Sequence, residues 1–126
     1  MERVVEIEDD LLVRCRAEED TLAEVRCALR NELLRAGLAD IKVPGQLQNC
    51  RLVTDADGTT TLVGEWRKQH GKVIGKVEIH ENGECFAELG VRQPAPDNPQ
   101  QRVERVVAFG APGSLHVELR LTPART

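Results

Sequence analysis

The sequence predicts a single α+β domain over residues 1–126, in which an antiparallel meander of five to seven strands packs one face on one long helix. Three observations indicate this fold class. One segment in the first third of the chain repeats its apolar residues every three to four positions, as a helix does. Most of the chain from residue 49 alternates apolar and polar residues, as strands do. Glycines preceded by Asp or Asn separate the alternating segments at hairpin spacing.

The long helix is expected over residues 21–36. Thr21-Leu22-Ala23-Glu24 has the S/T-x-x-E form of a capping box, in which a hydroxyl and a carboxylate each bond an end amide. Gly37 is expected to end the helix in a left-handed conformation. The core-facing stripe consists of Leu22, Val25, Leu29, Leu33 and Ala36.

Residues 3–17 precede this helix, and their apolar residues alternate with polar ones. The alternation predicts two short strands, or one bent strand broken at Glu8-Asp9-Asp10. The apolar positions are Val5, Ile7, Leu11, Val13 and Cys15.

Loop length fixes the register of the first hairpins. A three-residue loop at Ala56-Asp57-Gly58 pairs Leu52 with Leu62. The same loop at Glu81-Asn82-Gly83 pairs Val77 with Ala87. Both choices keep apolar residues on one face of the sheet.

A four-residue connection, Lys68-Gln69-His70-Gly71, is expected to join these two hairpins and to place Trp66 opposite Val73. Gly64 then faces Gly75, and the two missing side chains leave a dent in the apolar face. The long helix, Trp66 or a ligand would fill it.

The C-terminal third is less regular. Residues 93–101 are expected to form a polar, proline-rich loop. Residues 99–109 fit either a second, short helix starting at Asn98-Pro99 or a strand, and the valines favour the strand. Alternation at Leu115, Val117, Leu119 and Leu121 predicts a final strand.

Composition limits the function classes. The 126 residues include 21 acids and 17 bases, giving a net charge of −4, and only 2% are aromatic. A phosphate backbone demands the opposite charge, so nucleic-acid binding is not expected. No apolar stretch has membrane-spanning length and Met1 leads into an acidic segment, so no membrane association and a cytoplasmic location are expected.

Catalytic groups and metal ligands do not converge in the sequence, so we expect no cofactor, no metal and no catalytic residue. The four cysteines are too far apart for CxxC motifs and are interpreted as reduced thiols. Around one turn, His80, Glu81, Glu84 and Cys85 are neighbours. The expected register sends Cys85 to the apolar face and His80 to the other, which disfavours a metal site or a Cys-His pair.

The favoured function is a non-catalytic protein-interaction domain, self-associating as a homodimer through apolar surface that the core does not use. The candidate positions are Ala23, Cys27 and Leu34 on the helix, and Val53, Val63, Ile74 and Phe86 on the polar side of the sheet.

Two alternatives remain. The first is a small-molecule or metal-binding domain, or an enzyme, with a pocket on the sheet. Its polar groups would be His80, Glu78, Glu88, Arg92 and His116. The second is weak nucleic-acid or phosphate binding through the loop from Arg67 to Lys72.

Overall fold

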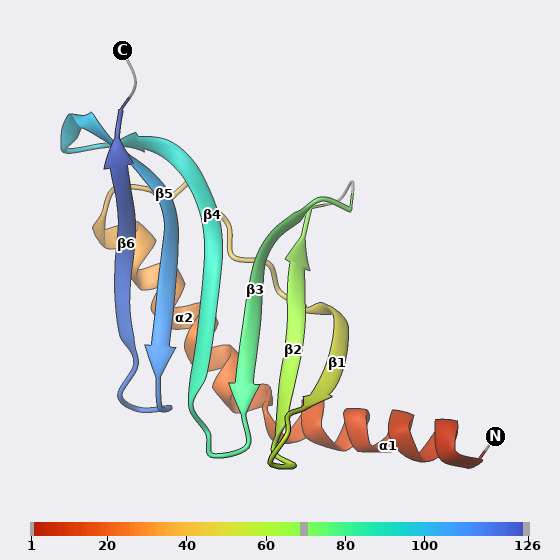
Figure 1. Cartoon of the computed structure of the whole chain (residues 1–126). Helices are drawn as coiled ribbons and strands as arrows, with labels where there is room; N and C mark the ends of the chain where they lie inside the picture. Colours follow the sequence, from red (N-terminus) through yellow and green to blue (C-terminus); the bar gives the residue numbers. More distant parts are fainter. Residues whose placement is uncertain (1, 69–70, 125–126) are drawn as a thin grey trace.

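The computed structural model describes residues 2–68 and 71–124, with side chains described from residue 10 onward. Two helices precede six strands: α1 (Glu2–Ala17), α2 (Glu19–Arg35), β1 (Gln48–Thr54), β2 (Thr60–Arg67), β3 (Val73–His80), β4 (Cys85–Ala95), β5 (Asn98–Gly110) and β6 (His116–Pro123). The strands form one antiparallel sheet in the order β1-β2-β3-β4-β5-β6. The predicted α+β class with an antiparallel meander is therefore confirmed. In Figure 1, α2 crosses behind β4 to β6, and α1 continues beyond β1.

The prediction of strands over residues 3–17 is wrong, because this segment is α1. Ile7, Leu11 and Cys15 recur every four residues, which is also helical spacing, and the first 36 residues contain no Gly or Pro to interrupt a helix. Glu8-Asp9-Asp10 continues the helix instead of turning. Arg14 and Arg16 in the last turn stabilise the negative end of the helix dipole.

The long helix, α2, begins at Glu19, two residues before the predicted start. Glu18 is the N-cap and makes no side-chain cap bond, so the capping box predicted at Thr21 does not form. Its amide instead bonds the carbonyl of Arg14 at 3.1 Å, which makes α1 and α2 nearly continuous. Because the chain enters α2 from a preceding helix, the first amides need no side-chain cap.

The C-terminal end of α2 confirms the predicted glycine stop. Gly37 has φ +79°, and its amide bonds the carbonyl of Leu34. The amide of Leu38 bonds the carbonyl of Leu33 at 2.8 Å, which completes a Schellman motif. The motif turns the chain back so that Leu38 is buried in the core.

The core lies between α2 and the sheet. Val25, Leu29 and Leu33 are fully buried, and Leu22 and Ala36 pack against them, as the predicted stripe requires. The buried residues of the strands complete the same cluster: Leu62, Trp66, Val77, Ile79, Cys85, Ala87, Leu89, Val91, Ala95, Val103, Val106 and Ala108.

Registers were predicted for three strand pairs, β1/β2, β2/β3 and β3/β4, and two of them are confirmed. Leu52 pairs with Leu62, and Val77 pairs with Ala87. Both loops place their last residue, Gly58 or Gly83, at positive φ. A three-residue loop with a left-handed glycine thus sets the register, as expected.

The register predicted between β2 and β3 is wrong by two residues. Trp66 lies opposite Gly75, and Gly64 lies opposite Val77. The loop closes with a bond from the Lys68 amide to the Lys72 carbonyl, and a further irregularity follows between Trp66 and Arg67. A shift of two residues keeps every side chain on its predicted face. Residues 69 and 70 of the predicted connection lie outside the described residues.

Gly64 and Gly75 do not face each other and share no dent, but filling by Trp66, one of the three expected alternatives, is confirmed at Gly75. A Cβ atom on Gly75 would lie 3.0 Å from Cε3 of Trp66, and one on Gly64 would lie 2.9 Å from Cδ1 of Leu47. Trp66 and Leu47 therefore fill the space that each glycine leaves.

The C-terminal third is entirely sheet. Residues 93–101 are not a long loop, because β4 reaches Ala95 and β5 begins at Asn98. Residues 99–109 are strand and not helix, as the β-branched valines favour. They extend the sheet and do not cover its outward face. The final strand, β6, is confirmed.

Candidate functional site

The sheet divides where β3 and β4 separate. These two strands pair only from Gly75 with Leu89 to Ile79 with Cys85. Beyond Leu89, β4 stays paired with β5 and passes through an irregularity between Gly90 and Gln93. Arg92 within it has φ +53°, which bends the strand. Figure 1 shows the two strands diverging from this point, and the opening forms a fork in the sheet.

The segment that leads from α2 to β1 crosses the fork and makes it a cleft of about 710 Å³. Two contacts hold this segment in place. Nε2 of Gln93 donates to a carboxylate oxygen of Asp40 at 3.2 Å, and Nε of Arg26 donates to the carbonyl of Pro44 at 2.8 Å. The cleft is therefore anchored to β4 at one end and to α2 at the other.

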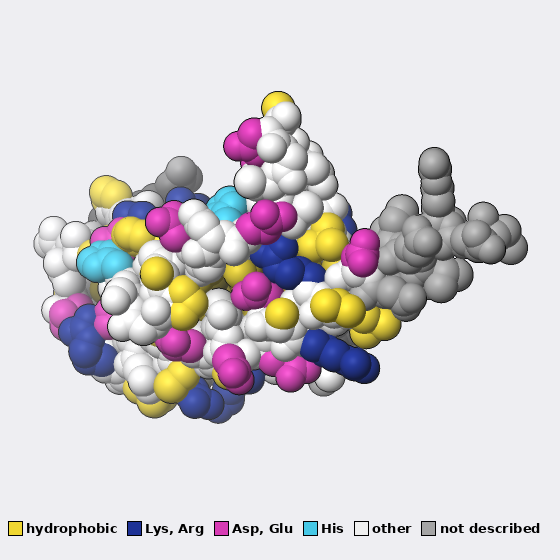
Figure 2. All heavy atoms as spheres, turned by 90° about the horizontal axis from the view of Figure 1, so that it is seen from below, with side chains coloured by type: hydrophobic (Ala, Val, Ile, Leu, Met, Phe, Trp, Pro, Cys, Tyr) yellow, Lys and Arg dark blue, Asp and Glu magenta, His cyan; other side chains and the backbone are white. Residues whose placement is uncertain are grey.

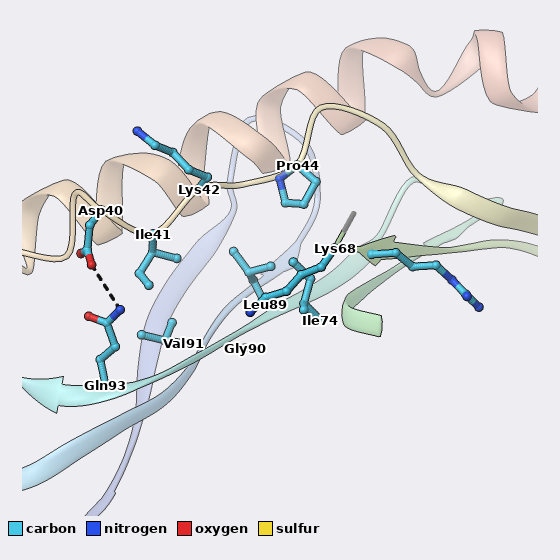
Figure 3. Close-up of a pocket in the computed structure, with 11 residues that line it drawn as sticks. Asp40, Ile41, Lys42, Pro44, Lys68, Ile74, Leu89, Gly90, Val91 and Gln93 are labelled. Atoms are coloured by element: carbon cyan, nitrogen blue, oxygen red, sulfur yellow. Dashed lines mark hydrogen bonds between the residues drawn. The ribbon is translucent and has the colours of Figure 1, made fainter. Parts of the chain in front are cut away.

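The lining of the cleft is mixed, and its apolar residues are Ile41, Pro44, Ile74, Leu89 and Val91. Figure 3 shows Ile41 directed toward Val91, with Leu89 and Ile74 further along the opening. Lys68 lies over this apolar surface, whereas Lys42 points away from it. An amphiphilic molecule matches a lining of this kind.

The charge around the cleft is positive. Among its described lining residues, Lys42, Arg67 and Lys68 are basic and Asp40 alone is acidic. Asp40 already accepts the Gln93 hydrogen bond, and Nη2 of Arg67 lies 2.7 Å from Oε2 of Glu65. Lys68 therefore supplies the positive charge best placed for a bound anion.

The second candidate site is α1, whose described anchoring contacts lie in its C-terminal half. Arg14 donates to the carbonyl of Ile79 at 2.9 Å and to the Thr60 hydroxyl at 3.0 Å, and its Nε lies 3.2 Å from the Glu18 carboxylate. Leu11 and Cys15 pack against the core. These contacts fix the direction in which the rest of the helix extends from the sheet (Figure 1).

Two large aliphatic side chains are exposed among residues 10–17 of α1. Leu12 is 54% exposed and Val13 is 67% exposed, although both are large aliphatic residues. Figure 2 shows hydrophobic side chains gathered where this helix leaves the body of the molecule, with a basic side chain beside them. We define Leu12, Val13 and the exposed Arg16 as the α1 ridge.

The predicted partner-binding residues do not form one surface. Ala23, Cys27 and Leu34 are exposed on α2. On the sheet, Val53 lies opposite Thr61, and Val63 and Phe86 both lie opposite Glu78, so polar residues separate these apolar ones. Ile74 lines the cleft.

Of the predicted ligand-binding residues, Glu88 and Arg92 line one hollow of about 280 Å³, whereas the two histidines lie apart. His80 ends β3 and His116 begins β6, and the two strands between them set these histidines on the order of 14 Å apart. Nδ1 of His80 lies 3.0 Å from the Thr61 hydroxyl. The other three have neighbours of their own: Glu78 lies near Lys76, Glu88 near Arg105, and the carbonyl of Arg92 accepts a bond from Arg102.

Cys85 is poorly suited to nucleophilic catalysis. Burial, together with the negative charges of Glu24 and Glu18, raises the pKa of its thiol above the usual range. Its Sγ donates to the carbonyl of Gly110 at 3.5 Å, on the core side of the sheet. Within residues 10–68 and 71–124, no three His, Cys, Asp or Glu side chains gather as a metal site would require.

Sequence reasoning missed the α1 ridge and named parts of the cleft only separately, with Ile74 as a partner-binding residue and Arg67 and Lys68 in the predicted phosphate-binding loop. The adjacent Leu11, Leu12 and Val13 exceed what one buried helix stripe accommodates, and this excess is the signal that could have identified the α1 ridge. The cleft has no such signal, because it depends on the separation of β3 and β4.

Comparison of the chain with protein-family models, with curated proteins and with solved structures finds no match. Neither helix, over its described residues, has the length and apolar content needed to cross a membrane. The function must therefore be argued from the two candidate sites.

Proposed function

We propose that the protein is a non-catalytic interaction domain that forms a homodimer through α1. The observation that carries this proposal is the exposure of Leu12 and Val13 on a helix that extends beyond the sheet. Adjacent exposed aliphatic residues on a helix that extends beyond the sheet are typical of an interface core.

Charge along α1 favours a second copy of the chain as the partner. Residues 2–10 contain five acids and one base, whereas residues 11–17 contain no acid and two bases, of which Arg16 is exposed and Arg14 is already paired with Glu18. Two such helices packed antiparallel bring the acidic half of each beside the basic half of the other. A two-fold axis near Leu12 and Val13 brings these two residues of one copy against the same residues of the other. The same axis sets the acidic residues of each α1 beside the basic residues of its partner.

The interface is small. A helix of 16 residues is about 24 Å long. A contact made mainly by two such helices falls below the usual size of a tight interface, so we expect association in the micromolar range. The dimer should therefore dissociate on dilution.

The test is sedimentation equilibrium across a concentration series. The double variant Leu12→Glu/Val13→Glu places two carboxylates at the centre of the interface and should remain a monomer at every concentration. The matched control is Leu34→Glu, which changes an equally exposed leucine, at 54%, on α2. This control should dimerise as the wild type does.

Far-UV circular dichroism and the thermal midpoint separate dissociation from unfolding. Both should be unchanged in the double variant, since neither side chain is in the core. A wild type that stays monomeric throughout the series, or a Leu34→Glu variant that dissociates while the α1 variant does not, would overturn the proposal.

A further inference from the structure

We propose that the cleft in the β3/β4 fork is a binding site for a small amphiphilic carboxylate with an aliphatic chain, as in a medium-chain fatty acid. This inference concerns a surface separate from the α1 ridge and does not depend on the homodimer. It rests on the shape of the cleft, its apolar lining and the position of Lys68.

The shape is that of a preformed ligand site. Its volume of about 710 Å³ falls within the range of small-molecule pockets. The Gln93 to Asp40 bond and the Arg26 to Pro44 bond already hold the crossing segment, so binding needs little ordering of the protein.

The lining separates into an apolar part and a charged part. Ile41, Pro44 and Ile74 are half-buried and offer aliphatic surface suited to an acyl chain, whereas Leu89 and Val91 are almost fully buried and contribute little of it. This apolar stretch would hold the chain of the ligand.

Lys68 supplies the contact that selects a carboxylate. Its side chain lies over the apolar surface in Figure 3, where its ammonium group can meet the head group of a ligand whose chain lies beneath. The cleft is locally basic although the chain carries a net charge of −4. That contrast favours an anion over a neutral or cationic amphiphile.

The first experiment uses decanoate as the probe and decanol as its neutral counterpart. Isothermal titration should show decanoate binding to the wild type more tightly than decanol. Lys68→Gln should weaken decanoate binding about two- to fivefold, the effect of one partly exposed charge pair, and leave decanol unchanged. The matched control Arg30→Gln removes one positive charge on α2 and should change neither affinity.

The isoleucines then locate the site. The chain has four, Ile7, Ile41, Ile74 and Ile79, of which the second and third line the cleft. In a spectrum of labelled isoleucine methyl groups, decanoate should shift the signals of Ile41 and Ile74. Ile79, buried in the core at the other end of β3, should not move. Leu89→Glu would bury a carboxylate in the core and destabilise the fold. Ile41→Glu, at a half-buried position, is therefore the better variant for blocking the cleft.

Three results would overturn the inference. The first is no saturable decanoate binding by the wild type. The second is binding that shifts all four methyl signals and ignores Lys68→Gln, which indicates unspecific adsorption. The third is decanol binding as tightly as decanoate, which excludes the carboxylate as the recognised group.

Discussion

The two helices are almost equal in length and follow one another directly, yet they use their apolar residues in opposite ways. α2 buries Val25, Leu29 and Leu33 completely, whereas α1 leaves Leu12 and Val13 exposed. The difference lies in what each helix meets. α2 crosses the sheet, whereas the described contacts of α1 with the sheet lie in its C-terminal half, and the helix extends past β1 (Figure 1). A similar apolar content therefore stabilises the fold in one helix and remains available for a partner in the other.

Equivalent leucine truncations test this comparison most directly. Leu29→Ala removes a fully buried side chain and should lower the free energy of unfolding by about 2–5 kcal/mol. Leu12→Ala removes an exposed one and should change it by less than about 0.5 kcal/mol. Urea denaturation at a protein concentration low enough to keep the chain monomeric measures both. Equal losses from the two variants would show that α1 is as much a part of the core as α2.

The ends of the helices differ too, and Gly37 tests the importance of that difference. A Cβ atom on Gly37 would lie 3.4 Å from the nearest atom, in Pro96, so space permits an alanine while the positive φ of +79° opposes it. Gly37→Ala should therefore cost about 1 kcal/mol of unfolding free energy, because the strain is in the backbone. α1 ends without such a glycine and passes through Glu18 into α2.

Gly45→Ala is the control for this change. Gly45 is not at positive φ, and the nearest atom to an added Cβ, Nη2 of Arg26, is 3.8 Å away. Thermal unfolding of the two variants should separate them. If both lose the same stability, the cost at Gly37 comes from crowding or from the unfolded chain, and the Schellman motif does not define the end of α2.

Sequence patterns predicted the regions whose structure is set locally. The hairpin loops ending in Gly58 and Gly83 fixed two registers because a short loop with a left-handed glycine leaves one closing geometry. The strand prediction for residues 3–17 is wrong because their apolar residues fit both the two-residue spacing of a strand and the four-residue spacing of a helix. The adjacent α2 favours the helix. The β2/β3 register failed at an irregularity after Trp66 that no residue type marks.

The cleft could not be predicted in the same way, because it arises from non-local geometry. The cleft exists since β4 bends at Arg92 and leaves β3, and since the chain before β1 crosses the opening. The predicted ligand residues were chosen for their chemistry on one sheet face, but intervening strands keep His80 and His116 apart. Residue type therefore identified candidates, and the fold determined which of them meet.

The smallest effect concerns the charge on the α1 ridge. Arg16 is exposed and follows Leu12 by four residues, so it lies on the same side of the helix. In the antiparallel homodimer it would face the acidic half of the other α1. Arg16→Glu replaces that attraction with repulsion and should weaken dimerisation about two- to fivefold at low salt, as expected for an exposed charge pair. Sedimentation equilibrium at two ionic strengths measures this.

Salt distinguishes the charge effect from a change in packing. The difference between Arg16→Glu and the wild type should shrink as the ionic strength rises, because salt screens exposed charges. Arg30→Glu reverses an equally basic, exposed residue on α2 and should leave the dimer unchanged. If Arg16→Glu strengthens the dimer, Arg16 does not face the acidic half of the partner helix, and the antiparallel arrangement is wrong.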